Sequence, residues 1–198
     1  MTALRLSRAM PALAVAAVLA AAAAVVLRVP APAPGIGGPF ELTAHDGRRL
    51  SSRDLAGKPF AVFFGFTRCP DICPTTLLDL SRVIAGLGQA ASGMRFLFVS
   101  VDPEHDTPEL LRLYLSSFDP HLTGLTGTPA EIAAVAKAYR AYYEKVPTSD
   151  GYTMNHTAVI YLMGADGRFH GTMRAEDPEA EQVAKLRELL ARGGRVGT

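Results

Sequence analysis

The chain has 198 residues and a net charge of +1, with acidic and basic side chains mixed along its length. That length allows one domain of ordinary size plus an extension, and the lack of long basic runs excludes a typical nucleic-acid-binding protein. Two cysteines allow at most one internal disulfide, which excludes a disulfide-rich scaffold.

Residues 1–28 differ in character from the rest of the chain. Arg5 and Arg8 precede an uncharged run at residues 10–27, half of which is alanine. As a helix this run would measure roughly 27 Å, close to the hydrocarbon thickness of a bilayer. We expect a membrane anchor with its amino terminus in the cytoplasm, and a cleaved signal peptide is the alternative. Both interpretations place the remainder of the chain outside the cytoplasm.

A linker is predicted next, at residues 29–39, with the sequence VPAPAPGIGGP. Alternating proline and alanine favour a stiff polyproline II spacer, and the glycines loosen its end. The globular domain is then predicted to occupy residues 40–198.

The first half of this domain alternates predicted strands and helices. Residues 40–58 contain an Asp-Gly turn typical of a hairpin, and the apolar run at 60–66 predicts a strand buried on both faces. A helix is predicted from Pro74, which can occupy its first turn, to Gly88. Residues 94–101 predict a second buried strand.

The next elements repeat this alternation. Thr107 or Asp106 is expected to cap a helix that begins at Pro108. A short strand follows near residues 122–125. Thr128 then begins a capping box, and its helix is expected to reach about Tyr143.

The last part of the domain predicts a hairpin and a helix. Residues 157–163 (TAVIYLM) form a strand that an Ala-Asp-Gly turn connects to an antiparallel partner, and Pro178 begins a helix that ends near Arg192. The order β-α-β-α followed by β-β-α indicates an α/β, thioredoxin-like fold, with a central mixed sheet flanked by helices.

Both cysteines, Cys69 and Cys73, lie at the predicted junction between the first buried strand and its helix. Binding and catalytic residues in such sheets lie at the carboxyl ends of the strands. The amino terminus of a helix also lowers the pKa of a nearby thiol. The Cys-x-x-x-Cys spacing fits a redox pair or two metal ligands. A structural disulfide is less suitable, because so short a loop removes little entropy from the unfolded chain.

A histidine occupies the position that should face this pair. Thioredoxin-like redox centres have two residues between their cysteines and a cis-proline loop opposite them. Here three residues separate the cysteines, and Asn155-His156 precedes the strand that we expect beside residues 60–66. We therefore predict that Cys69, Cys73 and His156 converge. Two thiolates and an imidazole suit Cu(I), Cu(II) with an added oxygen donor, or zinc with a water.

Four stretches carry a family resemblance: FFGFTRCPDICPTTL, FVSVDPEHDTPELLRLY, LTGLTGTPAEIAAVAKAYRAYYEKV and YTMNHTAVIYLMGADGRF. Over residues 40–192 the chain resembles the SCO/SenC family of membrane-anchored, thioredoxin-like copper proteins, which help to assemble the copper site of cytochrome c oxidase. The resemblance implies that Cys69, Cys73 and His156 bind a copper ion, Cu(I) or Cu(II). The family usually has aspartate before this histidine, where the present chain has Asn155.

The resulting hypothesis is an extracytoplasmic, periplasmic copper metallochaperone rather than an enzyme. Its implied partners are the copper-site subunit of cytochrome c oxidase, a copper donor, and the membrane through the amino-terminal helix. The alternatives are a thiol-disulfide reductase, with Cys69 and Cys73 catalytic, and a redox or copper sensor. Asp102 and Asp106, in VDPEHDTP, are expected to shape the loop after their strand rather than to bind metal.

Overall fold

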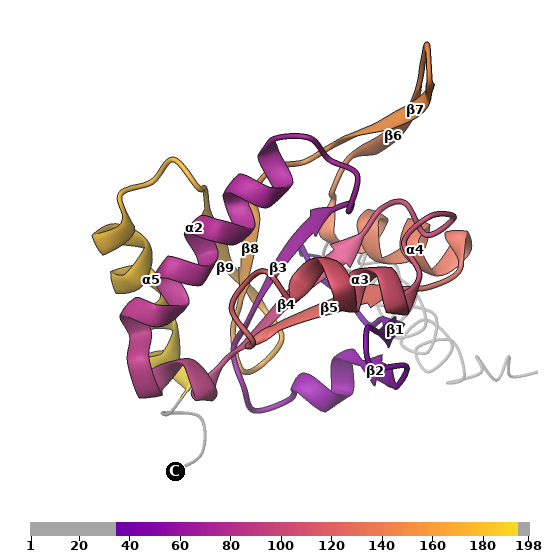
Figure 1. Ribbon diagram of the computed structural model, residues 1–198. Helices are drawn as coiled ribbons and strands as arrows, with labels where there is room; N and C mark the ends of the chain where they lie inside the picture. Colours follow the sequence, from indigo (N-terminus) through magenta and orange to yellow (C-terminus); the bar gives the residue numbers. More distant parts are fainter. Residues whose placement is uncertain (1–34, 194–198) are drawn as a thin grey trace, which may run out of the picture. The chain divides into compact units, whose positions relative to one another are not determined.

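The computed structural model of the protein describes residues 35–193 (Figure 1). The anchor or signal segment expected at residues 1–28, and residues 29–34 of the expected linker, lie outside this range. Within residues 35–193, no helix combines the length and the hydropathy that crossing a bilayer requires. The predicted division into anchor, linker and domain therefore stays a prediction.

A seven-stranded mixed sheet forms the centre of the domain, with the strand order β2-β1-β5-β4-β3-β8-β9. The central strands β3, β4 and β5 are parallel, and the outer strands join them antiparallel. The strands are β1 (Glu41–Ala44), β2 (Arg49–Ser51), β3 (Phe60–Gly65), β4 (Arg95–Ser100), β5 (Leu122–Thr126), β8 (Ile160–Met163) and β9 (Phe169–Met173).

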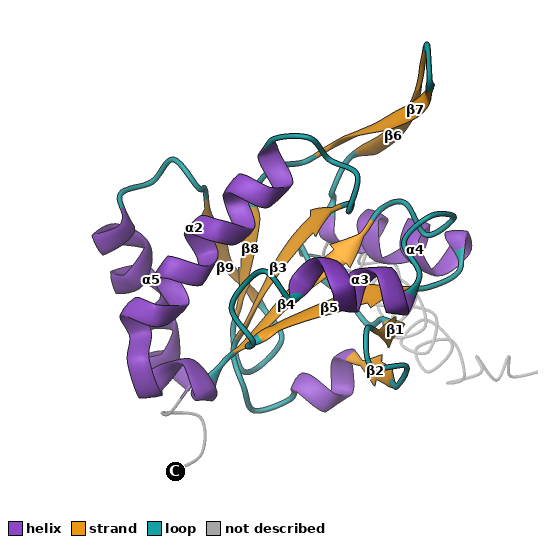
Figure 2. Ribbon diagram, in the orientation of Figure 1, coloured by secondary structure: helices purple, strands orange, loops and turns teal. Residues whose placement is uncertain are grey.

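Helices cover both faces of this sheet (Figure 2). The helical elements are η1 (Ser52–Leu55), α2 (Ile72–Leu87), η2 (Gly88–Gly93), α3 (Pro108–Leu115), α4 (Pro129–Tyr139) and α5 (Glu179–Gly193). The crossovers through α2 and α3 connect successive parallel strands, so right-handed connections place both helices on one face. Helix α5 packs against α2, where Arg187 donates a hydrogen bond to the carbonyl of Gly86. The predicted central mixed sheet flanked by helices is confirmed.

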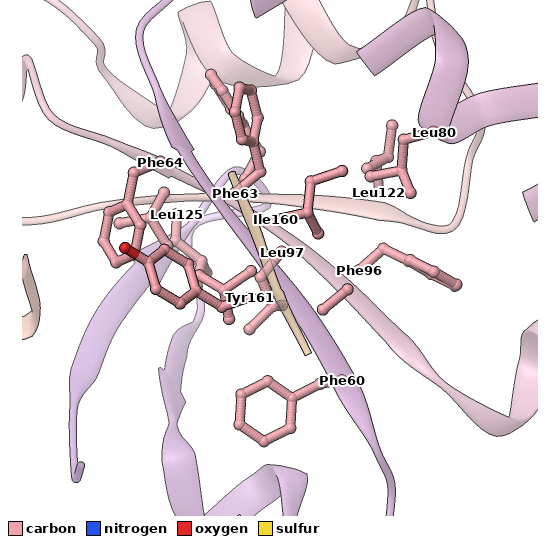
Figure 3. Close-up of a cluster of buried hydrophobic side chains, with 14 of the residues drawn as sticks. Phe60, Phe63, Phe64, Leu80, Phe96, Leu97, Leu122, Leu125, Ile160 and Tyr161 are labelled. Carbon is pink, nitrogen blue, oxygen red and sulfur yellow. The ribbon is translucent and has the colours of Figure 1, made fainter. Parts of the chain in front are cut away.

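Strand β3 lies in the middle of the core, and all of its residues are buried. Its side chains alternate between the two faces: Phe63 packs on Phe98, whereas Phe64 contacts Tyr139 of α4 and Tyr161 of β8 edge to face. Figure 3 shows Phe63, Phe64 and Tyr161 among other buried side chains of the sheet and of α2. The carboxyl end of β3 is thereby held on both sides by packed aromatic rings.

Several predicted boundaries need correction. Helix α2 begins at Ile72, two residues before Pro74. Helix α4 ends at Tyr139 rather than near Tyr143, because Arg140 adopts a left-handed conformation with φ of 53°. Strand β8 begins at Ile160, so the first three residues of TAVIYLM are not part of the sheet. The Asp-Gly hairpin of β1 and β2 is confirmed.

A second hairpin was not predicted from the sequence. Strands β6 (Tyr143–Thr148) and β7 (Gly151–His156) pair antiparallel as a separate two-stranded sheet that extends away from the main sheet in Figure 1. The sequence does contain a signal for it, since Asp150-Gly151 is a turn dipeptide between two β-rich segments. This hairpin ends at His156.

Candidate metal centre

The two cysteines lie where β3 gives way to α2. Cys69 precedes the helix, and Cys73 is its second residue. The Cys69 backbone N–H donates to the carbonyl of Phe66, and the Cys73 N–H points at the Cys69 Sγ atom, 3.4 Å away. Both thiols are free, and Cys69 is 8% exposed whereas Cys73 is fully buried. Of the two cysteines in this turn, Cys69 is therefore the one nearer the solvent.

Gly65 allows Cys73 to pack against the end of β3. A Cβ atom at this position would lie 2.8 Å from the Cys73 Sγ atom and 2.6 Å from Cε2 of Phe98. Those distances are shorter than real carbon contacts, so a side chain here would displace the sulfur or the ring. The glycine of the FFGF stretch is explained by this close approach.

The imidazole of His156 is oriented by three contacts. The ring meets Phe66 nearly perpendicular at 5.8 Å between centroids, and Phe63 edge to face at 6.1 Å. Its Nδ1 atom lies 3.1 Å from the carbonyl oxygen of Thr157. A carbonyl can only accept, so Nδ1 carries the proton of the neutral ring and the lone pair belongs to Nε2. Nε2 lies 3.3 Å from the Cys73 Sγ atom.

The structure brings the three predicted residues together. The Sγ atoms of Cys69 and Cys73 and a ring nitrogen of His156 all lie within 4.8 Å of one another. The predicted convergence is confirmed, and His156 is the last residue of the unpredicted hairpin rather than part of a loop before β8. That these atoms bind a metal is a proposal taken up below.

The two thiols have opposite shifts in pKa. The hydrogen bond from Cys73 is the main cause that lowers the pKa of Cys69 to about 4, and backbone N–H groups add to it. The same hydrogen bond, together with burial, raises the pKa of Cys73 well above its usual range. The proton of the pair therefore resides on Cys73, whose S–H is directed to the Cys69 sulfur.

Asn155 does not support the imidazole. Its side chain is exposed and lies on the opposite face of β7 from His156, across from Glu144 of β6. The carbonyl of Thr157 occupies the ring nitrogen that an outer carboxylate could support. The ring is therefore supported by a neutral carbonyl, and the residue before His156 contributes no charge to it.

A second cluster of potential ligands comprises Asp102, His105 and Asp106. Its carboxylates already accept hydrogen bonds from the donors Thr67, Arg68, Ser100, His105 and Tyr152. The contacts agree with the expectation that Asp102 and Asp106 shape the loop, and we assign no metal to them. Sequence reasoning missed the partners Thr67, Arg68 and Tyr152, because they meet these carboxylates only through tertiary structure.

The chain is similar to known proteins in sequence and in fold. The family model described as SCO1/SenC matches residues 29–191. The human mitochondrial protein SCO1 homolog is 42% identical over 140 residues, which cover 69% of this chain and 46% of that protein. The chain thus spans about half the length of the curated relatives that it matches.

Two solved structures show similar folds. The structure of Bradyrhizobium japonicum ScoI with copper bound is 51% identical, with a TM-score of 0.75 that covers 78% of this chain and 99% of that one. A structure described as revealing a disulfide switch in BsSco, a member of the Sco family of cytochrome c oxidase assembly proteins, is 26% identical, with a TM-score of 0.65 and coverage of 83% and 98%.

Proposed function

The chain belongs to the SCO1/SenC family, and from this premise we propose that it is a copper metallochaperone. It binds one copper ion through Cys69, Cys73 and His156 and delivers it to the copper site of cytochrome c oxidase. The observation that carries the proposal is the convergence of two thiol sulfurs and an unprotonated ring nitrogen within 4.8 Å. The copper-bound ScoI structure supports copper as the ion.

The donor set fits copper as cargo. Thiolate sulfur is the soft ligand that Cu(I) prefers, and a neutral imidazole completes three donors. Cys69 is already a thiolate at neutral pH, so only the proton on Cys73 must leave when the ion binds. Zinc can use the same atoms, but the relative with bound metal favours copper. Incoming ligands of the recipient can then displace the three donors without a change in the oxidation state of the ion.

The proposed location is the extracytoplasmic face of the membrane. It rests on the expected anchor or signal segment at residues 1–28, and on the oxidase assembly role stated for the Sco family in the description of BsSco. The proposed partners are the copper-site subunit of the oxidase and a copper donor. The division into residues 1–28, a linker at 29–39 and a domain at 40–198 is part of the same proposal.

One observation favours a second function, thiol-disulfide reduction of the oxidase's copper-site cysteines. The low pKa of Cys69 makes it a thiolate at the amino terminus of α2, which is the form that attacks a disulfide. The disulfide switch described for BsSco agrees with redox-active thiols in this family. The same two cysteines would serve either function, so cysteine variants cannot separate them.

His156→Ala separates the two functions. The full-length, reduced protein should bind one copper ion, and the variant should lose affinity and the thiolate-to-Cu(II) absorption of the three-donor site. Its reduction of a model disulfide should stay within a few-fold of the wild type, because thiolate attack does not require the imidazole. His121→Ala is the matched control, since His121 is exposed and bonds only with Asp119 among the described residues.

A complementation assay in cells that lack the protein is the second part of this test. His156→Ala should fail to support oxidase assembly, and added copper should restore assembly in cells that lack the protein, because mass action can replace a carrier but not a reductant. Full complementation by His156→Ala, together with no effect of copper, would favour the reductase instead.

A further inference from the structure

The element that carries His156 needs anchors outside itself. Strands β6 and β7 form a two-stranded sheet of their own, and a single hairpin is marginally stable in water at best. At its base, the N–H of Thr157 donates to the carbonyl of Tyr142, and the N–H of Tyr142 donates to the Thr157 hydroxyl. These two bonds fix the position of the base but not the direction in which the hairpin extends.

Tyr152 provides an anchor further along the hairpin. Side chains alternate along a strand, so Tyr152, Met154 and His156 share one face of β7. Tyr152 lies four residues before His156, roughly 13 Å along the strand. A contact at Tyr152 therefore sets the orientation of the face that presents the imidazole.

This anchor is polar and specific. The Tyr152 hydroxyl lies 2.9 and 3.1 Å from the two carboxylate oxygens of Asp102, which is 3% exposed. The tyrosine ring lies under the guanidinium of Arg68, at 4.4 Å from its centroid, and 3.9 Å from the ammonium of Lys145. Lys145 itself pairs with Glu104 at 2.6 Å. The inner face of the hairpin is thus attached to the loop between β4 and α3.

The same loop holds the cysteine turn. Arg68, the neighbour of Cys69, donates to Asp102 at 2.9 Å. The backbone N–H and the hydroxyl of Thr67 donate to Asp106 at 3.0 and 2.6 Å. One carboxylate, that of Asp102, is therefore bonded both to the residue before Cys69 and to the hairpin that ends at His156.

We propose that Arg68, Asp102 and Tyr152 are positioning residues that set the separation of the thiols from His156. We name these three residues the Asp102 link. Ligand atoms must fall within about 0.2 Å of their bonding distances for a metal to bind well, so small rotations of the hairpin matter. The consequence for copper rests on the proposed function, whereas the consequence for the hairpin does not.

Tyr152→Phe tests the link with the least change. It removes one hydroxyl and leaves the aromatic ring between its two cations. Tyr142→Phe is the matched control, because Tyr142 is exposed and its hydroxyl bonds with Glu144 on the hairpin itself. A hydrogen bond to a charged group contributes enough to slow local opening roughly tenfold to a hundredfold.

Two measurements on the full-length protein follow. In the metal-free, reduced state, Tyr152→Phe should accelerate amide hydrogen exchange of β6 and β7 roughly tenfold to a hundredfold. Exchange of the amides of β3 and β4 should not change. Copper affinity, measured with a competing chelator, should fall at least about tenfold in Tyr152→Phe and not in Tyr142→Phe. Asp102→Asn combined with Tyr152→Phe should be less than additive, because both changes act on one link.

The possible outcomes distinguish a failure of the proposed copper function from a failure of the positioning role. Wild-type protein that binds no copper would refute the proposed function, while the exchange data would still report on the link. Wild-type protein that binds copper, with Tyr152→Phe identical to it in exchange and affinity, would overturn the positioning role. A hairpin that loosens without any change in copper affinity would also overturn it, since the contact would then be structural only.

Discussion

Replacement of Gly65 by alanine should damage the centre more than the fold. The added Cβ would stand 2.8 Å from the Cys73 Sγ atom, and ordinary contact begins at 3.4 Å, so the sulfur must move by about 0.6 Å (3.4 − 2.8). Cys73 is fixed in the first turn of α2, and Phe98, which the Cβ would also meet, is fully buried. Overpacking of this kind costs about 1–3 kcal/mol of unfolding free energy. The displacement is also about three times the roughly 0.2 Å tolerance of a metal–ligand distance.

Thermal unfolding and copper titration measure the two effects separately. The melting temperature of the metal-free protein should fall by roughly 2–12 °C for a chain of this size. Copper affinity should fall at least about tenfold. Gly124→Ala is the control, because its Cβ would lie 2.8 Å from Cδ1 of Leu115 and reaches neither thiol. It should lose similar stability and keep copper affinity. A Gly65→Ala variant with both properties unchanged would refute the steric argument.

Three further predictions concern the thiols and the hairpin. At pH 6, iodoacetamide should modify Cys69 before Cys73, as mapped by peptide mass spectrometry. The rate of modification at Cys69 should not change between pH 6 and pH 8, whereas the thiolate fraction of an ordinary thiol rises about a hundredfold over this range. Equal labelling of the two cysteines would contradict the assignment of the proton to Cys73. Copper affinity in competition titrations should rise about tenfold per pH unit between roughly pH 7 and 9, because binding displaces the proton from Cys73; no pH dependence would mean that Cys73 is already ionised. Asn155→Asp should leave copper affinity within a few-fold of the wild type, because the Thr157 carbonyl already accepts from Nδ1 of His156. The new carboxylate would face Glu144, so the unfolding free energy measured in urea should fall by about 0.2–1 kcal/mol. A large loss of copper affinity would refute the assigned orientation of the ring.

The core elements could be predicted because local signals determine them. The apolar run at residues 60–66 could only be buried on both faces, and the capping box at Thr128 set the start of α4. The predicted end of α4 was wrong. Ala141 and the tyrosines after it continue a helical pattern in the sequence, but the left-handed conformation of Arg140 ends the helix before them. Residues 140–143 were therefore assigned to the helix, and the hairpin that begins at Tyr143 was not predicted.

The candidate site was predictable in its members but not in its support. Two cysteines at the end of β3, and a histidine before the neighbouring strand, indicated convergence from strand order alone. The Asp102 link joins segments 34 and 50 residues apart, so no local pattern could reveal it. The role of Gly65 likewise depends on tertiary structure, because the sulfur of Cys73 in α2 packs against this glycine.

His156 lies 83 positions after Cys73 in the sequence, and this separation has a consequence for biosynthesis. A ribosome adds about 5–20 residues per second, so the thiol pair emerges roughly 4–17 s before its imidazole. Throughout that interval β8, which pairs with β3 in the finished sheet, is also missing. Disulfide formation in an oxidising compartment begins on the scale of seconds. At the proposed extracytoplasmic location, the newly made protein would therefore meet oxidants before His156 is synthesised, so reduction of Cys69 and Cys73 would have to precede the proposed copper loading.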